Sequence, residues 1–268
     1  MSEFVKRSIT GAVYVAVTLG AAMLGQWVTL LVFLPVCLLA AREWQALRVV
    51  EGTVAVPLWS TLVLCGTAYA GMGLLPMMPW LRVGHLALVL LAVLFLLIHM
   101  ILRAGDKDPM SAFTFHLGTV LYIAAPFALS THFLATGPHP FLGFMFLLWT
   151  SDTGAYLVGR AIGRNKLMPA VSPGKTWEGL VGGVMLTMAL GWVLSLYWKE
   201  FTAVQWMAGA AAVAMSATLG DLLESAFKRA HGVKDSGNVL PGHGGILDRF
   251  DGFLLAAPAM WLMIQALS

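Results

Sequence analysis

Residues 8–41 read SITGAVYVAVTLGAAMLGQWVTLLVFLPVCLLAA and contain no charged side chain. A helix rises 1.5 Å per residue, so about 20 apolar residues cross the hydrocarbon core of a bilayer. These 34 residues are too many for a single span, and Gly25-Gln26 is the natural break between two. The stretch therefore predicts two membrane-spanning helices, near 8–24 and 27–41.

The composition of the whole chain also indicates a membrane protein. Of its 268 residues, 59% are hydrophobic and 11% are charged, and the mean hydropathy is +0.82. Soluble domains carry roughly 25% charged residues, so a soluble protein is excluded. The formal charge of +3 and the pI near 9.0 are usual for a membrane protein with basic cytoplasmic loops and do not indicate nucleic-acid binding. Cys37 and Cys65 both lie in apolar runs, so no disulfide is expected.

Further apolar segments predict seven more spans. They lie near 54–75, 83–102, 111–135, 141–160, 179–198, 203–222 and 250–267. The predicted fold is thus an all-α integral membrane protein of about nine transmembrane helices without a soluble domain. We expect one polytopic domain over 1–268, in which 1–105 form helices one to four. The remainder, 106–268, would hold catalytic helices five to nine, with cytoplasmic loops at 160–178 and 221–250.

The distribution of Lys and Arg predicts the orientation, because loops rich in these residues stay in the cytoplasm. With a cytoplasmic N-terminus, the inner segments carry Lys6, Arg7, Arg42, Arg48, Arg103, Lys107, Arg160, Arg164, Lys166, Lys175, Lys228, Arg229, Lys234 and Arg249. The outer segments carry Arg82 and Lys199. We therefore expect a bacterial-type inner-membrane protein whose motif-bearing loops face the cytoplasm. The start, MSEFVKR, superficially resembles a signal peptide, but more spans follow at once and a retained helix is expected.

The stretch from Asp221 to Gly252 holds nine of the 29 charged residues of the chain, and its middle is rich in glycine. Asp221, Ser225 and Lys228 are spaced i, i+4 and i+7, which places them on one face of a helix. Carboxylate oxygens suit Mg²⁺, basic side chains suit phosphate oxygens, and glycine lets backbone N–H groups approach both. The pattern predicts a site that holds a hard cation against phosphates.

This stretch is also similar to a known family. The resemblance is carried by Ser225-x-Phe-Lys228-Arg229, Lys234-Asp235, Pro241-x-His243-Gly-Gly245 and Asp248-Arg249-x-Asp251. It resembles the signature of phosphatidate cytidylyltransferases, with no departure across these 27 residues. The resemblance implies transfer of a cytidylyl group from CTP to phosphatidate, which gives CDP-diacylglycerol and pyrophosphate for phospholipid biosynthesis. It also implies a homodimer.

The resemblance implies roles for individual residues. Asp221 and Asp248 would bind the catalytic Mg²⁺, with a second cation possible, and Lys228 would join them in catalysis. Ser225, Arg229, Lys234, His243 and Arg249 would contact substrate phosphates, although His243 could instead act as an acid, a base or a structural support of the loop. Asp251 would support the site and sits where it could cap the last helix, and Glu224 is a weaker candidate. Basic residues beside a span can also be simple membrane anchors, and a lone Asp can simply end a helix.

A second site is expected at Ser172-Pro-Gly-Lys-Thr-Trp-Glu-Gly179. Its Gly174-Lys175-Thr176 suggests a P-loop, but a Walker motif needs glycine where this chain has Pro169, and no strand is expected before it. A loop that leads into a helix N-terminus is itself an anion site. The family has a similar Ser-Pro-Lys-like element, from which this chain departs by Gly174. We expect Lys175 to contact a nucleotide or lipid phosphate.

Asp152 lies inside a predicted span, about eight residues from its inner end. Burial of a carboxylate there costs several kcal/mol unless it is paired, so a supporting role in the site is expected. The alternative is a structural hydrogen-bond cluster with Thr150 and Thr153.

Two other functions stay open on the sequence. One is a different lipid-phosphate transferase, such as a CDP-alcohol phosphotransferase or a CTP-dependent polyprenol kinase. The Asp-Gly-x-x-Ala-Arg motif of the former fails after Asp251-Gly252, because Phe253-Leu-Leu-Ala256 follows, with no arginine. The other is a secondary transporter with Asp152 as a proton relay, although transporters tend to show inverted repeats and midplane charges. Here most ionisable residues gather at one face and no repeat is apparent.

Overall fold

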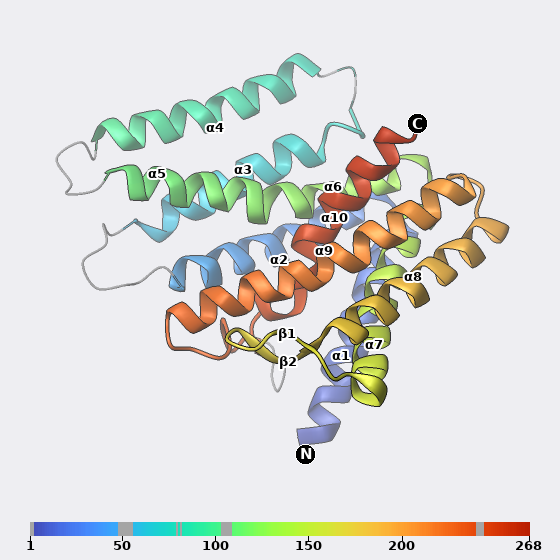
Figure 1. The fold of residues 1–268 in the computed structure, drawn as a ribbon. Coiled ribbons are helices and arrows are strands. Elements are labelled where there is room, and N and C mark those ends of the chain that lie inside the picture. The colour runs from blue at the N-terminus through green and yellow to red at the C-terminus, as the bar shows by residue number, and fades with distance from the viewer. Residues whose placement is uncertain (1–2, 48–55, 79, 81, 103–108, 240–243) are drawn as a thin grey trace. The chain divides into compact units, whose positions relative to one another are not determined.

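A computed structural model describes the chain except for residues 1–2, 48–55, 79, 81, 103–108 and 240–243 (Figure 1). The described residues are mostly helical. The helices are α1 (Glu3–Leu24), α2 (Gln26–Ala46), α3 (Leu58–Gly73), α4 (Arg82–Leu102), α5 (Pro109–Gly118), the π-helix η2 (Thr119–Ala124), α6 (Ala125–Phe133), the 3₁₀ turn η3 (Leu134–Thr136), α7 (His139–Ile162), α8 (Trp177–Tyr197), α9 (Ala203–Ala230) and α10 (Leu247–Ala266). Two short strands, β1 (Lys166–Met168) and β2 (Ser172–Thr176), lie between α7 and α8.

Within the described part of the chain, five helical segments are long and apolar enough to cross a membrane. They are Gln26–Ala46, Met110–Phe133, His139–Ile162, Trp177–Tyr197 and Ala203–Ala230. The mostly helical fold and the presence of several potential spans confirm the predicted class of a helical, multi-pass membrane protein. The predicted number of nine spans stays a prediction.

The break between the first two helices is where the sequence predicts it. α1 ends at Leu24, α2 begins at Gln26, and Gly25 between them has φ 102°. This backbone conformation is open to glycine and strained for residues with a Cβ. Gly25 therefore ends α1 in spite of the uninterrupted apolar sequence around it.

The predicted loops need two corrections. The segment 160–178 is more than a loop, because β1 and β2 pair as an antiparallel hairpin with Lys166 opposite Thr176. The Val171 N–H donates to the Met168 carbonyl (3.2 Å) across a turn that contains Pro169, whose fixed φ suits that position. The predicted loop 221–250 begins ten residues later, since α9 continues to Ala230. Residues 221–230 include four charged side chains, so the apolar segment ends before them. Their helix propensity is nevertheless high, and the helix continues.

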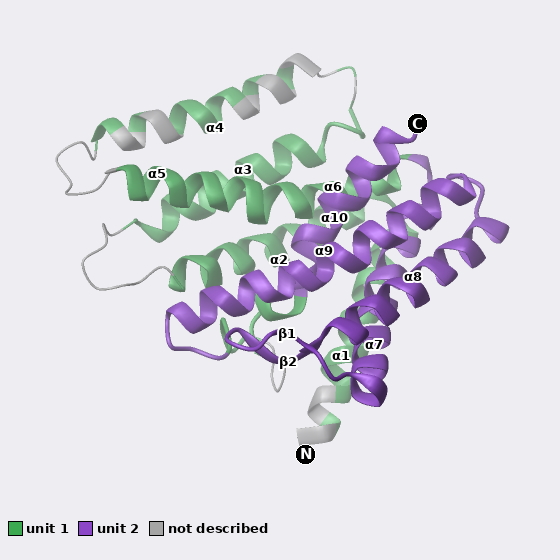
Figure 2. Ribbon diagram, in the orientation of Figure 1, with its two compact units in different colours: residues 1–135, 235–249 green, residues 136–234, 250–268 purple. Residues whose placement is uncertain are grey.

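The described chain forms two compact units (Figure 2). Unit 1 contains residues 1–135 and 235–249, and unit 2 contains residues 136–234 and 250–268. The boundary within α10 falls between Arg249 and Phe250. Unit 1 thus includes 106–135 and 235–249, which the predicted division into 1–105 and 106–268 assigns to the catalytic helices; that division stays a prediction.

Unit 1 is held by buried contacts between α2, α3 and α6. The Tyr69 hydroxyl donates to the Leu30 carbonyl (2.9 Å), and Thr131 Oγ1 donates to the Gly73 carbonyl (2.7 Å). Cys37 and Cys65 are free, fully buried thiols whose Sγ atoms lie 3.4 Å apart. The expected absence of a disulfide agrees with this arrangement.

Unit 2 is built on closely packed helices α7, α8 and α9. A Cβ added to Gly183 of α8 would lie 3.1 Å from the Ser151 carbonyl oxygen of α7, and one added to Gly179 would lie 2.7 Å from the Ala155 carbonyl. Near the other end of α7, a Cβ on Gly143 would lie 2.3 Å from the ring of the fully buried Trp206. Small residues allow this close approach of helices in membrane proteins. The packing fixes the ends of α7 and α8 that frame the candidate site.

Candidate active site

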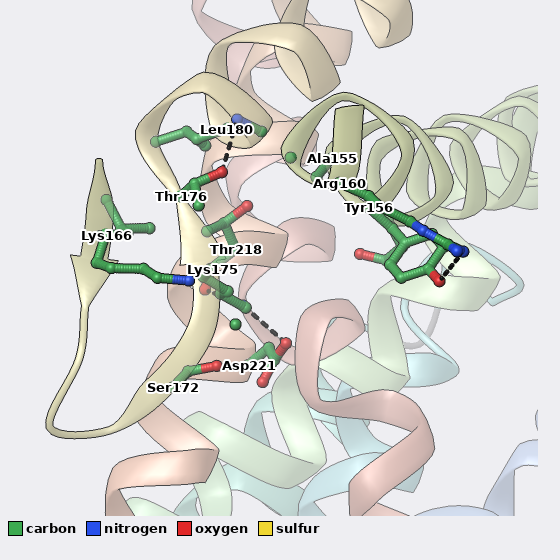
Figure 3. Close-up of a pocket in the computed structure, with 15 residues that line it drawn as sticks. Ala155, Tyr156, Arg160, Lys166, Ser172, Lys175, Thr176, Leu180, Thr218 and Asp221 are labelled. Carbon is green, nitrogen blue, oxygen red and sulfur yellow. Dashed lines mark hydrogen bonds and ion pairs between the residues drawn. The ribbon is translucent and has the colours of Figure 1, made fainter. Parts of the chain in front are cut away.

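Unit 2 contains a cavity of about 580 Å³ between α7, the hairpin, the start of α8 and α9 (Figure 3). This volume is typical of small-molecule sites, which span roughly 300–1,000 Å³. Its polar and charged lining residues are Asp152, Tyr156, Arg160, Lys166, Ser172, Lys175, Thr176, Thr218 and Asp221. The lining thus combines basic side chains with carboxylates and hydroxyls. Such a lining can bind an anion and retain acidic groups beside it.

Lys175 connects the hairpin to α9. Its ammonium Nζ lies 2.7 Å from Asp221 Oδ2 and donates to the Thr218 carbonyl (3.1 Å). The side chains of Lys175 and Asp221 are 22% and 40% exposed, so the pair borders the cavity without being sealed. The next residue, Thr176, accepts a hydrogen bond from the Gly179 N–H (3.1 Å) and caps α8. The structure therefore places Lys175 beside a helix N-terminus, as predicted.

The predicted helical face of Asp221, Ser225 and Lys228 is confirmed in part by direct contacts. Ser225 Oγ donates to Asp221 Oδ1 (3.1 Å), so one carboxylate oxygen contacts a hydroxyl and the other contacts Lys175. Lys228 instead pairs with Glu224, with 2.5 Å between Nζ and Oε2. The Glu224 side chain is fully buried and that of Lys228 is 13% exposed. This pair forms a second acidic and basic contact on α9.

Asp152 lies in the wall of the cavity. The residue is exposed there and lines the cavity. The described residues give it no hydrogen bond to Thr150 or Thr153, which removes the structural alternative. Asp152 interacts electrostatically with Asp221 and Lys175. It therefore belongs to the charged lining of the site.

Asp251 needs a correction. It does not cap the last helix, since α10 begins at Leu247 and Asp251 lies beyond its first turn. Its Oδ1 accepts the Gly252 N–H (2.6 Å), and its carboxylate interacts electrostatically with Asp221, Asp152 and Lys175. Helices α7, α9 and α10 thus each contribute one carboxylate to this part of unit 2.

The donor chemistry of unit 2 suits a hard divalent cation. Asp152, Asp221 and Asp251 are oxygen donors of the kind that Mg²⁺ prefers, and the Lys175 ammonium already lies against one of them. Among the described residues, no three His, Cys, Asp or Glu side chains form a preassembled metal cluster. The residues therefore fit the ion by chemical type and charge.

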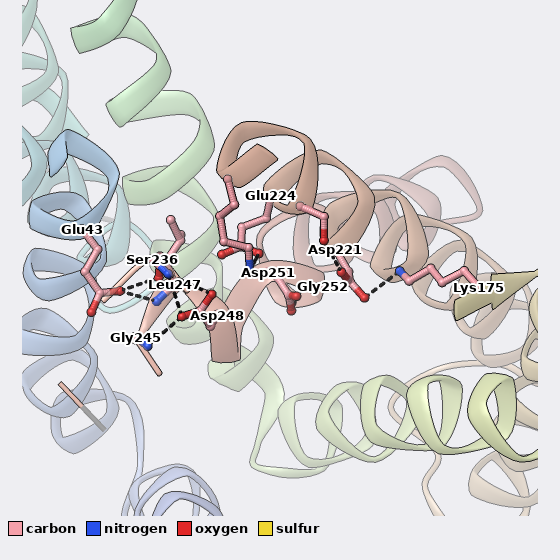
Figure 4. Close-up of polar contacts among 12 residues, drawn as sticks. Glu43, Lys175, Asp221, Glu224, Ser236, Gly245, Leu247, Asp248, Asp251 and Gly252 are labelled. Atoms are coloured by element: carbon pink, nitrogen blue, oxygen red, sulfur yellow. Dashed lines mark hydrogen bonds and ion pairs between the residues drawn. The ribbon is translucent and has the colours of Figure 1, made fainter. Parts of the chain in front are cut away.

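Unit 1 contains a separate acidic centre. Asp248, in the first turn of α10, accepts the Gly245 N–H at Oδ2 (2.7 Å) and the Ser236 N–H at both oxygens (3.2 and 3.0 Å). Beside it, Glu43 of α2 accepts the Leu247 N–H (2.8 Å), as Figure 4 shows. The predicted metal ligands Asp221 and Asp248 belong to different units, so their joint role stays a prediction.

Glu43 is not among the predicted site residues. It follows the predicted span near 27–41, but it lies within α2 and is 5% exposed. An acidic residue directly after a long apolar segment was the available signal, because such a carboxylate needs partners. Its partners are about 200 residues away in the chain, which no local pattern reveals.

The other predicted phosphate ligands lie at the surface or outside the described residues. Arg229, Lys234 and Arg249 are exposed. His243 lies outside the described residues. Their predicted roles stay predictions.

Comparisons with known proteins agree with the family resemblance of the signature. The model of the cytidylyltransferase family matches residues 5–267. A phosphatidate cytidylyltransferase of Staphylococcus aureus (strain COL) is 37% identical over 188 residues, which cover 69% of this chain and 72% of that protein. Phosphatidate cytidylyltransferases of Staphylococcus saprophyticus and Staphylococcus haemolyticus are 37% and 38% identical over 177 and 180 residues, or 65% of this chain and 68% of each relative.

Proposed function

The chain belongs to the cytidylyltransferase family, and from that premise we propose that it is a phosphatidate cytidylyltransferase. It transfers the cytidylyl group of CTP to phosphatidate and so produces CDP-diacylglycerol and pyrophosphate for phospholipid biosynthesis. A phosphate oxygen of phosphatidate forms a bond to the α-phosphorus of CTP, and the bond from that phosphorus to the β-phosphate oxygen breaks. No covalent intermediate on the protein is needed.

The observation that carries this proposal is the cavity of unit 2, where Lys175 contacts Asp221 beside the N-terminus of α8. Both substrates are anions, so their approach requires positive charge. Lys175, Arg160 and Lys166 supply it within the lining, and basic groups of this kind bind phosphate oxygens. The hydroxyls of Ser172 and Thr218 add hydrogen-bonding groups to the same lining.

Within this proposal, the carboxylates serve the cation. Asp221 and Asp248 would hold Mg²⁺, and Asp152 and Asp251 would add negative charge near Asp221. The ion would neutralise phosphate oxygens as charge develops on the leaving pyrophosphate. Asp221 also orients Lys175 and Ser225 through its two oxygens. Lys228, which pairs with Glu224, lies about two turns beyond Asp221 along α9 and would contact a substrate phosphate.

The membrane arrangement is part of the same proposal. We propose nine spans, a cytoplasmic N-terminus and a bacterial-type inner membrane, supported by the distribution of 14 basic residues on one side and two on the other. One substrate is a soluble triphosphate and the other a lipid, so the reaction belongs at the cytoplasmic membrane surface. A homodimer and a second cation remain part of the proposal, and we propose no nucleic-acid partner.

The test uses detergent-purified protein, phosphatidate, Mg²⁺ and CTP labelled either at the α-phosphate or at the γ-phosphate. We expect the α-label to enter the lipid phase and pyrophosphate to be released. Entry of the γ-label alone would identify a lipid kinase and overturn the proposal. A folded protein that transfers neither label would be a different kind of protein, such as a transporter.

A further inference from the structure

Glu43 is a buried carboxylate that the reaction described above does not use. It lies near the end of α2, is 5% exposed, and accepts three hydrogen bonds from a segment about 200 residues later in the chain. The donors are the Ile246 N–H to Oε1 (3.0 Å), the Leu247 N–H to Oε2 (2.8 Å) and Ser236 Oγ to Oε2 (3.1 Å). All of these residues belong to unit 1.

Two of these donors are backbone N–H groups at the start of α10. The first N–H groups of a helix have no partner within the helix, and the helix dipole attracts negative charge there. Glu43 therefore caps α10 from a different helix. A buried carboxylate requires such hydrogen bonds, because without them its burial would be strongly unfavourable.

The surrounding glycines leave room for this contact. A Cβ added to Gly245 would lie against Glu43 Oε2 and Ser236 Oγ, both at 2.4 Å. A Cβ added to Gly237 would lie 2.5 Å from Glu43 Oε1. Side chains at these two positions would displace the carboxylate. The segment and Glu43 thus fit one another closely.

The same segment holds Asp248. The Ser236 and Gly245 N–H groups donate to Asp248. The Ser236 hydroxyl and the N–H groups of Ile246 and Leu247 donate to Glu43. The two carboxylates therefore bind neighbouring groups of Ser236 and of residues 245–247, although they come from opposite ends of the sequence (Figure 4). Displacement of Glu43 would release the groups that orient Asp248.

We propose that Glu43 is a positioning residue, which fixes the start of α10 and thereby the direction of the Asp248 carboxylate. This inference rests on the proposed function, in which Asp248 serves the reaction. Glu43 itself touches no reacting group. Its contribution passes through its hydrogen-bond donors at Ser236, Ile246 and Leu247.

The first test compares Glu43→Gln with Glu43→Asp in the purified full-length protein. The amide of glutamine removes the charge and one acceptor oxygen, so we expect kcat to fall at least about tenfold, while KM for CTP changes less than about threefold. Aspartate keeps the charge and should restore part of the rate. The matched control is Glu200→Gln, because Glu200 also pairs with another side chain, His139 (2.6 Å between Oε1 and Nδ1), and does not line the cavity. A wild-type kcat in Glu43→Gln would overturn the inference.

The second test is hydrogen exchange, which does not depend on activity. We expect peptides containing the Ile246 and Leu247 amides to exchange at least about tenfold faster in Glu43→Gln than in wild type, with α7 and α8 unchanged. Unchanged exchange would contradict the inference.

Should Glu43→Gln fail to fold, Gly245→Ala tests the same contact by displacing the carboxylate, and it should show both effects. Failure of the proposed function would look different, because wild-type protein would form no CDP-diacylglycerol while the exchange measurement still reports on Glu43.

Discussion

The two acidic centres hold their carboxylates in different ways. In unit 1, Glu43 and Asp248 accept hydrogen bonds chiefly from backbone N–H groups, and Glu43 is buried. In unit 2, Asp221 contacts the side chains of Lys175 and Ser225 and remains 40% exposed beside a cavity. Backbone donors fix a carboxylate in place, whereas a lysine can exchange one anion for another. The comparison leads us to expect that substitutions in the first centre disturb the local backbone as well as the reaction, whereas those in the second disturb chiefly the reaction.

The largest expected effects come from removing one carboxylate in each centre. Asp221→Asn and Asp248→Asn should each lower kcat by about 100- to 1,000-fold at saturating Mg²⁺, since both are proposed to serve the cation. They should differ in hydrogen exchange, because Asp248 also holds the Ser236 and Gly245 N–H groups. Faster exchange of those amides in Asp248→Asn alone would support the comparison. Retained activity in folded Asp248→Asn would disprove its metal role.

Lys175→Met should have the next largest effect. It removes a positive charge from the cavity, and we expect kcat/KM for CTP or phosphatidate to fall roughly 10- to 100-fold, with little change in thermal stability. Lys199→Met is the matched control, because Lys199 also donates to a helix carbonyl, that of Ser195 (2.7 Å), but does not line the cavity. Equal losses in both variants would show that Lys175 has no particular role.

Asp152→Asn should have a smaller effect that depends on Mg²⁺. The change removes one negative charge near Asp221, so attraction for a divalent cation weakens. We expect the rate to fall about tenfold at limiting Mg²⁺ and to recover at saturating Mg²⁺. The measurement is a Mg²⁺ titration of initial rates. A loss that persists at high Mg²⁺ would indicate another role for Asp152.

The smallest expected effects distinguish the centres most sharply. Ser225→Ala and Ser236→Ala each remove one hydroxyl that donates to a carboxylate. Ser225→Ala should lower kcat about two- to tenfold and leave stability unchanged. Ser236→Ala should instead lower the unfolding temperature, because its hydrogen bond with Glu43 is buried. Thermal unfolding and initial rates of both variants test this, and a reversed pattern would contradict the comparison.

The sequence predicts the helices better than the connections between them. Local sequence features are sufficient to predict the break at Gly25 and the shared helical face of Ser225 and Asp221, since both depend on residues that are close in the chain. The end of α9 was misplaced at 222 because apolar content reports the membrane, whereas helix propensity continues to Ala230. The hairpin of β1 and β2 was missed because its strands have three and five residues, too few for a clear alternation of polar and apolar positions.

The candidate site was predictable where a motif is contiguous. Lys175 and Asp221 were identified from their own segments, but their 2.7 Å contact joins a hairpin to a distant helix. Glu43 was not identified, because its role depends on amides about 200 residues away. The exposure of Asp152 also depends on the cavity, which is formed by four separate elements. Tertiary packing decides these features, and the sequence of one segment does not contain that information.

The two cysteines make this protein convenient for site-directed labelling. Cys37 and Cys65 are the chain's full complement of cysteines, and both thiols are fully buried against one another. Maleimide and spin-label reagents should therefore leave the folded native chain unmodified. A cysteine introduced at Ser172, on the hairpin beside the cavity, would then be labelled selectively and would report the arrival of nucleotide through the fluorescence or mobility of its probe.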